Sequence, residues 1–197
     1  MMSRVRKRLN AAERRDKILS AAARSFAADG YDRAKMDDIA VGAGVTKPVL
    51  YDHFRSKQAL FLAVLESVRD RLIARGRSIA AENAEPEQKF HRAVDALFRF
   101  VEQEPDAART LLMTPSGDLE AARLSREMQA GASEGLSVLL ASFVRADDLH
   151  MQAVTEFLKQ GLHALALWWL DHPDMTREEV VDIVMRIAWS GLQRSHA

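Results

Sequence analysis

The sequence predicts an all-α protein. Across its 197 residues, apolar side chains recur at every third or fourth position, and almost no stretch alternates as a strand would. The chain has no cysteine, so neither disulfides nor a thiolate metal site can hold it together. We expect about nine helices, divided between a small N-terminal three-helix domain and a larger C-terminal helical domain.

The first helix has clear start and stop signals. Asn10 is followed three residues later by Glu13, the spacing of a capping box, and Gly30 is placed to end the helix. A fresh N-cap at Ser56 then opens a long helix over about residues 57–81. Its buried side is expected to carry Leu60, Phe61, Val64, Leu65, Val68 and Leu72.

Between these two helices the sequence predicts a helix-turn-helix over residues 39–54. Gly44 stands where a tight turn needs a residue that tolerates positive φ. Thr46 should cap the next helix by accepting a backbone N–H with its hydroxyl. Pro48 falls in the first turn, where its missing N–H costs nothing.

The two sides of that second short helix differ in chemistry. Leu50 and Phe54, four residues apart, should face inward. Lys47 and Tyr51, also four apart, should face outward together with Pro48. A basic, polar and aromatic face on a short helix is what reading the major groove of DNA requires.

The rest of the chain continues as helices separated by breaks. A polar stretch at residues 82–86 precedes a helix through Phe90 and Val101, and Pro105 and Pro115 delimit a short helix. Longer helices are expected over about residues 118–145, 148–171 and 176–194, the last opened by a second capping box, Thr176 with Glu179.

The net charge of zero says nothing about nucleic acid, but the distribution of charge does. Residues 1–57 carry 13 Lys and Arg against 7 Asp and Glu, a formal +6, so the remainder carries −6. The basic part contains the helix-turn-helix, which concentrates the attraction for phosphates at one end of the protein.

Residues 10–65 closely resemble the DNA-binding domain of the TetR family of bacterial regulators. The resemblance rests on four motifs in order: Gly30-Tyr31, Asp38-Ile39-Ala40, residues 43–48 (Ala-Gly-Val-Thr-Lys-Pro) and residues 50–54 (Leu-Tyr-Asp-His-Phe). It implies a three-helix reading head, a six-helix regulatory body, dimerisation through the last two helices, and an effector that changes the spacing of the two heads. One departure is Ala34-Lys35, where the family usually has Thr or Ser at the start of the second helix.

We therefore expect residues 1–56 to form an N-terminal arm and a helix-turn-helix DNA-binding domain, and residues 57–197 a ligand-binding and dimerisation domain. The basic run at residues 4–8 is either a disordered tail or a minor-groove arm. Tyr51 and His53 taken alone would fit ordinary packing, but within the motif we interpret them as DNA contacts. The expected DNA-binding residues are Lys35, Thr46, Lys47, Pro48, Tyr51, His53 and Lys57.

The regulatory body is rich in apolar and adaptable side chains and poor in charges that would bind a polar ligand. This favours a small hydrophobic effector, although the same residues would also fit a simply packed core. The expected ligand-binding residues are Phe90, Val94, Leu97, Phe98, Val101, Leu112, Met113, Met128 and Phe143.

The last two helices carry apolar stripes with small residues that allow close approach, as a four-helix dimer interface needs. We expect a homodimer. The expected interface residues are Gly161, Leu165, Trp168, Trp169, Val184, Ile187, Ala188 and Gly191.

Enzymatic motifs are missing: the sequence has no Gly-x-Ser-x-Gly elbow, no glycine-rich phosphate loop and no paired metal-ligand motif, so we expect no enzyme, cofactor or metal. No apolar run approaches the length of a membrane span, which predicts a cytoplasmic protein. The function predicted is a dimeric repressor that binds a palindromic operator and is released by a hydrophobic effector. The alternatives are a DNA-binding regulator controlled by a protein partner, or a helical protein-interaction module.

Overall fold

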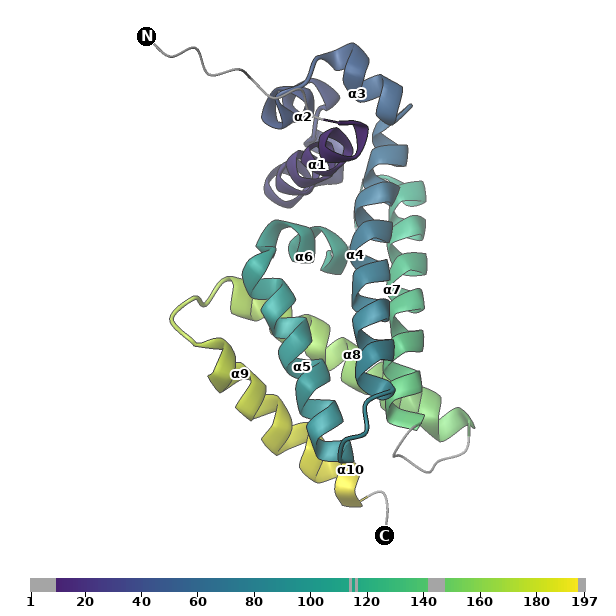
Figure 1. Ribbon diagram of the computed structural model, residues 1–197, viewed down its shortest axis with the longest axis vertical. Coiled ribbons are helices and arrows are strands. Elements are labelled where there is room, and N and C mark those ends of the chain that lie inside the picture. The colour runs from purple at the N-terminus through teal and green to yellow at the C-terminus, as the bar shows by residue number, and fades with distance from the viewer. Residues whose placement is uncertain (1–9, 114, 116, 142–147, 195–197) are drawn as a thin grey trace.

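The computed structural model describes residues 10–113, 115, 117–141 and 148–194 (Figure 1). All regular structure in these residues is helical, which confirms the predicted all-α class. The elements are α1 (Ala11–Arg33), α2 (Met36–Ala43), α3 (Lys47–His53), α4 (Lys57–Ala80), α5 (Pro86–Gln103), α6 (Pro105–Leu112), α7 (Leu119–Ala141), α8 (Asp148–Leu170), α9 (Arg177–Val184), the π-helical segment η1 (Met185–Trp189) and α10 (Ser190–Arg194).

The helix starts follow the capping signals of the sequence. Both bonds of the Asn10–Glu13 capping box form, each at 2.8 Å, and the Ser56 hydroxyl accepts the Ala59 N–H at 3.0 Å. The second capping box, at Thr176, also forms. Gly30 interrupts α1 with φ 74°, so the regular helix stops where the glycine predicted and one further turn follows.

The final helix runs without a break from Arg177 to Arg194, as predicted, but its middle turn, η1, is π-helical. The π turn of η1 separates α9 from α10 and takes up an extra residue. The resulting shift in register turns Trp189 inward, where it is 8% exposed and its ring lies 5.9 Å from that of Phe90. Side-chain packing therefore decides the geometry of this helix beyond its periodicity.

Two hydrophobic cores share the long helix α4. The head core joins α1, α2 and α3 to the first half of α4, and also includes Ala107 and Leu111 of α6 and Ala121 of α7. The body core joins the end of α4 to α5, α6, α7, α8, α9 and η1. Figure 1 shows α4 running from the bundle of α1, α2 and α3 down through the body with α7 beside it. Packing thus does not break at the expected domain boundary after residue 56.

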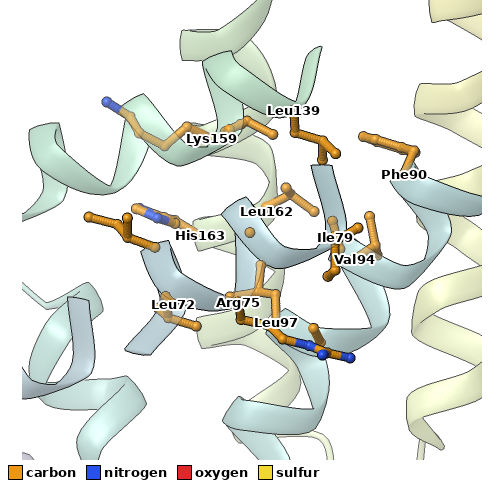
Figure 2. Close-up of a pocket in the computed structure, with 15 residues that line it drawn as sticks. Leu72, Arg75, Ile79, Phe90, Val94, Leu97, Leu139, Lys159, Leu162 and His163 are labelled. Carbon is orange, nitrogen blue, oxygen red and sulfur yellow. The ribbon is translucent and has the colours of Figure 1, made fainter. Parts of the chain in front are cut away.

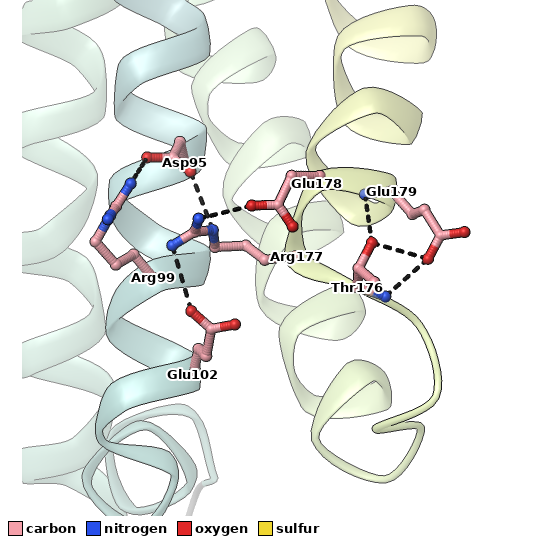
Figure 3. Close-up of polar contacts among 7 residues, drawn as sticks. All are labelled: Asp95, Arg99, Glu102, Thr176, Arg177, Glu178 and Glu179. Carbon is pink, nitrogen blue, oxygen red and sulfur yellow. Dashed lines mark hydrogen bonds and ion pairs between the residues drawn. The ribbon is translucent and has the colours of Figure 1, made fainter.

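A buried arginine ties α9 to α5 (Figure 3). Arg177, only 15% exposed at its side chain, contacts Asp95 at 3.2 Å, Glu102 at 3.3 Å and Glu178 at 2.8 Å. Asp95 in turn pairs with Arg99 at 2.8 Å. This network holds α9 against α5.

The described residues also lack two features. No helix among them is long and apolar enough to cross a bilayer. Nor do any three His, Asp or Glu side chains gather there as a metal site would require.

Candidate nucleic-acid interface and ligand pocket

The turn between α2 and α3 is built on Gly44. Its φ is 67°, as predicted, and its N–H donates to the Val41 carbonyl at 3.0 Å. The next N–H, of Val45, reaches back to the Ala40 carbonyl at 3.0 Å. These two bonds make a Schellman motif, which satisfies the last carbonyls of α2 and fixes the angle at which α3 leaves it.

Helix α3 turns one face to the core and the other to solvent, as the sequence predicts. Leu50 is fully buried and Phe54 is 4% exposed, with the Arg15 guanidinium 4.7 Å above the Phe54 ring. On the outer face Lys47 and Pro48 are exposed, and Tyr51 is 39% exposed.

Lys47 is charged and accessible at the start of α3. Its ammonium contacts the Asp37 carboxylate at 2.8 Å, and the hydrogen bond to Asp37 raises the pKa of Lys47 above its ordinary value. Both side chains are more than half exposed. Because such surface pairs are weak, Lys47 can exchange this carboxylate for a DNA phosphate or a guanine edge.

The predicted cap at Thr46 is wrong in one respect. Thr46 has the extended backbone of an N-cap, but its hydroxyl accepts no bond from α3 in the described structure. Pro48, in the first turn of α3, removes one of the N–H groups that such a hydroxyl would serve. The exposed Thr46 hydroxyl stays available to solvent or to DNA. Lys35, likewise exposed, makes no side-chain cap at α2.

Lys57 differs from the other expected DNA contacts. Its ammonium donates to the carbonyls of Tyr31, Asp32 and Ala34 at 2.8, 3.0 and 3.3 Å. It also lies 4.6 Å from the centre of the Tyr31 ring. These bonds use all three donors of the ammonium group. Lys57 therefore joins the start of α4 to the end of α1.

The second feature is an apolar cavity of about 130 Å³ in the regulatory body (Figure 2). Helices α4, α5, α7 and α8 all contribute to its wall. The lining residues are Leu72, Ile73, Arg75, Gly76, Ile79, Phe90, Ala93, Val94, Ala96, Leu97, Leu136, Leu139, Lys159, Leu162 and His163.

Of the nine residues expected to bind a ligand, three line this cavity: Phe90, Val94 and Leu97. Five others, which lie on α5, at the end of α6 and on α7, do not line it. Phe98 and Val101 are fully buried in the body core, and Leu112 is 9% exposed. Met113 is half exposed. Met128 packs against the head core, and its sulfur accepts a hydrogen bond from the Arg69 guanidinium at 3.1 Å. Phe143 lies outside the described residues.

The expected dimer residues divide in the same way. Gly161, Trp168, Ile187 and Gly191 are exposed, with Trp168 at 43% and Ile187 at 71%. Leu165 and Ala188 are half-buried. Trp169 and Val184, at 8% and 6%, face the core of their own chain, which removes them from a surface available to a partner.

With this geometry in view, comparisons with known proteins become informative. Residues 18–64 match the family model described as bacterial regulatory proteins, tetR family. Over 191 residues the chain is 31% identical to the transcriptional activator FasR of Mycolicibacterium smegmatis, covering 94% of this chain and 85% of that protein. The chain belongs to the TetR family. It is accordingly a helix-turn-helix transcriptional regulator, as the sequence predicts.

Other TetR-like proteins match this chain over nearly its whole length. The repressor KstR2 of M. smegmatis is 27% identical, over 93% of each chain. Among solved structures, the fatty acid degradation regulator FadR of Bacillus halodurans superposes with a TM-score of 0.78 at 22% identity, covering 90% of this chain and 98% of that one. FadR of Bacillus subtilis, solved with stearoyl-CoA, gives 0.76 at 18% identity, covering 90% and 97%.

Several residues of the cavity and of the exposed face of α8 in this TetR-family chain were not predicted from the sequence. The cavity walls from α4 and α8 were not anticipated, although Leu72 had been placed on the inner stripe of α4. On α8, exposed Leu149 and Phe157, at 74% and 75%, escaped notice. The spacing of Phe157, Gly161 and Trp168 places them on one helix face, and this spacing is the signal that indicates an exposed apolar face on α8.

Proposed function

We propose that this TetR-family regulator is a dimeric repressor that binds a palindromic operator and is released by a small hydrophobic effector held in the α4–α5–α7–α8 cavity. The observation that carries the proposal is the double role of α4. Its first half belongs to the head core, and its second half forms a cavity wall through Leu72 and Ile79. A ligand that moves the second half therefore acts directly on the reading head.

The cavity is small for a drug-sized ligand. Its small size supports coupling between the cavity and the head, because a larger ligand must move α4. A space of about 130 Å³ is close to that of an engineered cavity that holds benzene, while ligand pockets usually exceed roughly 300 Å³. A larger effector has to separate α4 from α5 and α8. If it favours the separated state by about 3 kcal/mol, operator affinity falls roughly 150-fold.

Similar proteins support the same class of effector. The FadR structure from B. subtilis contains stearoyl-CoA, a long acyl chain on a polar carrier. KstR2 is named a repressor and FasR an activator, so the sign of regulation rests on experiment. We propose repression because one helix joins the head to the cavity. A ligand that enters the cavity can then release the head from DNA.

On the DNA side we propose contacts from Lys35, Thr46, Lys47, Pro48, Tyr51 and His53. Two heads related by a two-fold axis would read half-sites about one helical turn apart or slightly more. Replacing Tyr51 by Phe should weaken binding to all sequences by about 1 kcal/mol, through loss of one phosphate hydrogen bond. Lys47→Ala should lower the salt slope by about one unit if it contacts phosphate, or relax one base preference if it contacts guanine.

The measurement is fluorescence anisotropy with operator and scrambled duplexes at two salt concentrations. Arg126→Ala, an exposed arginine on α7, is the matched control and should leave both affinity and salt slope unchanged. If Tyr51→Phe and Lys47→Ala both bind as the parent does, α3 is not the reading helix. A chain that binds no duplex at any salt concentration would instead fit the protein-interaction alternative.

For the dimer we propose the exposed apolar face of α8 and η1, centred on Trp168, Ile187 and the small Gly161 and Gly191. Ile187→Glu would bury an unpaired charge there and yield monomers with little operator affinity. Leu119→Glu provides the control, since Leu119 is 87% exposed at the start of α7. Light scattering that still shows an Ile187→Glu dimer of undiminished affinity would place the interface elsewhere.

The effector is tested by adding candidate compounds to the operator complex and by mass spectrometry of ligands retained on purification. Hydrophobic compounds should release the DNA, and Ala96→Leu, which fills the cavity, should block release while preserving operator binding. If no small molecule is retained and only a protein releases the DNA, the partner-controlled alternative replaces this proposal.

A further inference from the structure

The polar side chains that line the cavity are all basic. Twelve of the fifteen lining residues are glycine or purely apolar. The other three are Arg75 on α4 and Lys159 and His163 on α8. No described lining residue carries a carboxylate or a hydroxyl. A wholly apolar ligand offers these three groups no hydrogen-bond acceptor, whereas an anion offers one to each group that it reaches.

Lys159 and His163 form a pair on one wall. They are four residues apart on α8 and so lie on the same face of the helix, and Figure 2 shows them on the same side of the cavity. The Lys159 side chain is 13% exposed, and its ammonium contacts Glu156 at 2.5 Å. Glu156 itself is 56% exposed, so an incoming anion competes with a solvated carboxylate for a largely buried cation.

The other two basic groups have no such partner among the described residues. Neither ring nitrogen of His163 is hydrogen-bonded there, and burial, together with Lys159, lowers the pKa of His163 below its ordinary value. The Arg75 guanidinium makes no ion pair within the described chain. The nearby carboxylates are already engaged: Asp95 by Arg99 and Arg177 (Figure 3), and Glu104 by Arg71 at 2.8 Å.

We propose that the ligand of this cavity is an anionic amphiphile, with an apolar tail among the leucines of α4, α5 and α7 and an anionic head held by Lys159 and His163. This inference rests on the proposed function, because it specifies the effector of the same cavity. The anion is either a free carboxylate or the phosphate groups of an acyl thioester. A positively charged amphiphile is excluded by repulsion from the same wall.

The test uses four compounds with the same tail: decanoate, decanoyl-CoA, decanol and decylamine. Binding is followed by tryptophan fluorescence, since Trp189 stacks on Phe90, which lines the cavity. The parent protein should bind decanoate or decanoyl-CoA at least about tenfold more tightly than decanol, as one charge-assisted hydrogen bond predicts. Decylamine should bind most weakly.

Three variants separate head recognition from tail burial. Lys159→Met should lose about tenfold in affinity for the anionic compound and leave decanol unchanged. Glu156→Gln removes the carboxylate that pairs with Lys159. It should raise the affinity for the anionic compound and again leave the affinity for decanol unchanged. Arg126→Met removes an exposed positive charge on α7 outside the cavity and should alter neither. Unchanged decanol binding also shows that each variant is folded.

The outcomes are distinct. If decanoate binds more tightly than decanol and this difference depends on Lys159, the bound anion is the carboxylate. If only decanoyl-CoA binds more tightly, the bound anion is its phosphates. Both results support the proposal. If decanol binds and releases operator DNA as well as either anion does, or if Lys159→Met weakens all compounds alike, the anionic head is wrong while the hydrophobic effector stands. If none of the four binds or releases DNA, the proposed effector function itself fails.

Discussion

The two cores of this protein use similar side chains but pack them differently. In the head, the rings of Phe26, Tyr31 and Phe61 meet at 4.9 to 5.9 Å, and fully buried Ala22 lets the helices come close. A hollow of about 220 Å³ also borders these rings, but its wall carries charged side chains, among them Asp29, Asp32 and Arg33, unlike the apolar cavity of the body. In the body, Phe98 packs on Trp169 and Phe90 on Trp189, but beside them lies the cavity of about 130 Å³. The half-buried ring of Phe100 packs against both.

The difference teaches what each core is built to do. In the proposed dimer, a reading head has to hold α3 in one position relative to the second α3, and close packing provides that rigidity. A body that answers a ligand needs space and a wall that can move. The head core should therefore resist added volume, and the body core should accept it.

The largest expected effect comes from adding volume to each core. Ala22→Leu should destabilise the protein by about 2 to 3 kcal/mol, because overpacking forces the helices of the head apart. Ala93→Leu points its added carbons at the cavity and should change the free energy of unfolding by less than about 1 kcal/mol. Urea denaturation measures both. Equal losses in the two variants would show that the cores are alike.

The second comparison is between two partly buried lysines. Lys57 donates to three backbone carbonyls at the junction of α1 and α4, so Lys57→Met should cost about 1.5 to 2 kcal/mol. Among the described residues Lys159 is held by Glu156 alone, and Lys159→Met should cost less than about 0.5 kcal/mol. A stable Lys57→Met protein with weakened DNA binding would return Lys57 to the set of DNA contacts.

A smaller effect is expected at the turn of the reading head. Gly44→Ala places a side chain at φ 67° and should cost about 1 kcal/mol by strain alone, since no atom lies within 4 Å of the added carbon. Gly42→Ala is the matched control. Its new carbon would lie 3.6 Å from Ala21 inside a helix, so we expect a gain of about 0.5 kcal/mol. Thermal unfolding of the two variants should move in opposite directions.

The smallest expected effect is the pH dependence of stability that His163 in the body contributes. Burial lowers the pKa of His163 below 6.5, so the unfolded chain takes up this proton more readily than the folded one. Stability should be complete above about pH 6.5 and decline as the pH falls below it. His163→Leu should flatten the decline as the pH falls below about 6.5. An identical decline in the parent and His163→Leu would contradict the assignment.

Local signals predicted most of the head. Gly44, Asn10 with Glu13, and the inward Leu50 and Phe54 all follow from interactions between residues close in sequence, and each is found as predicted. Thr46 is the exception. Whether its hydroxyl caps α3 depends on which backbone N–H groups remain in the first turn, where Pro48 has none. The internal bonds of Lys57 could not be predicted, because its partners, the carbonyls at the end of α1, are some 23 to 26 residues away.

The sequence by itself determined the helical class, the helix starts, the position of the reading helix and the family, because these depend on short-range periodicity, caps and a contiguous motif. Only the tertiary structure decided which apolar residues of the body border space and which fill the core. Phe90 and Phe98 lie on the same helix with the same chemistry, yet only Phe90 lines the cavity. That distinction depends on how α4, α7 and α8 approach α5, and long-range packing of this kind leaves no local mark on the chain.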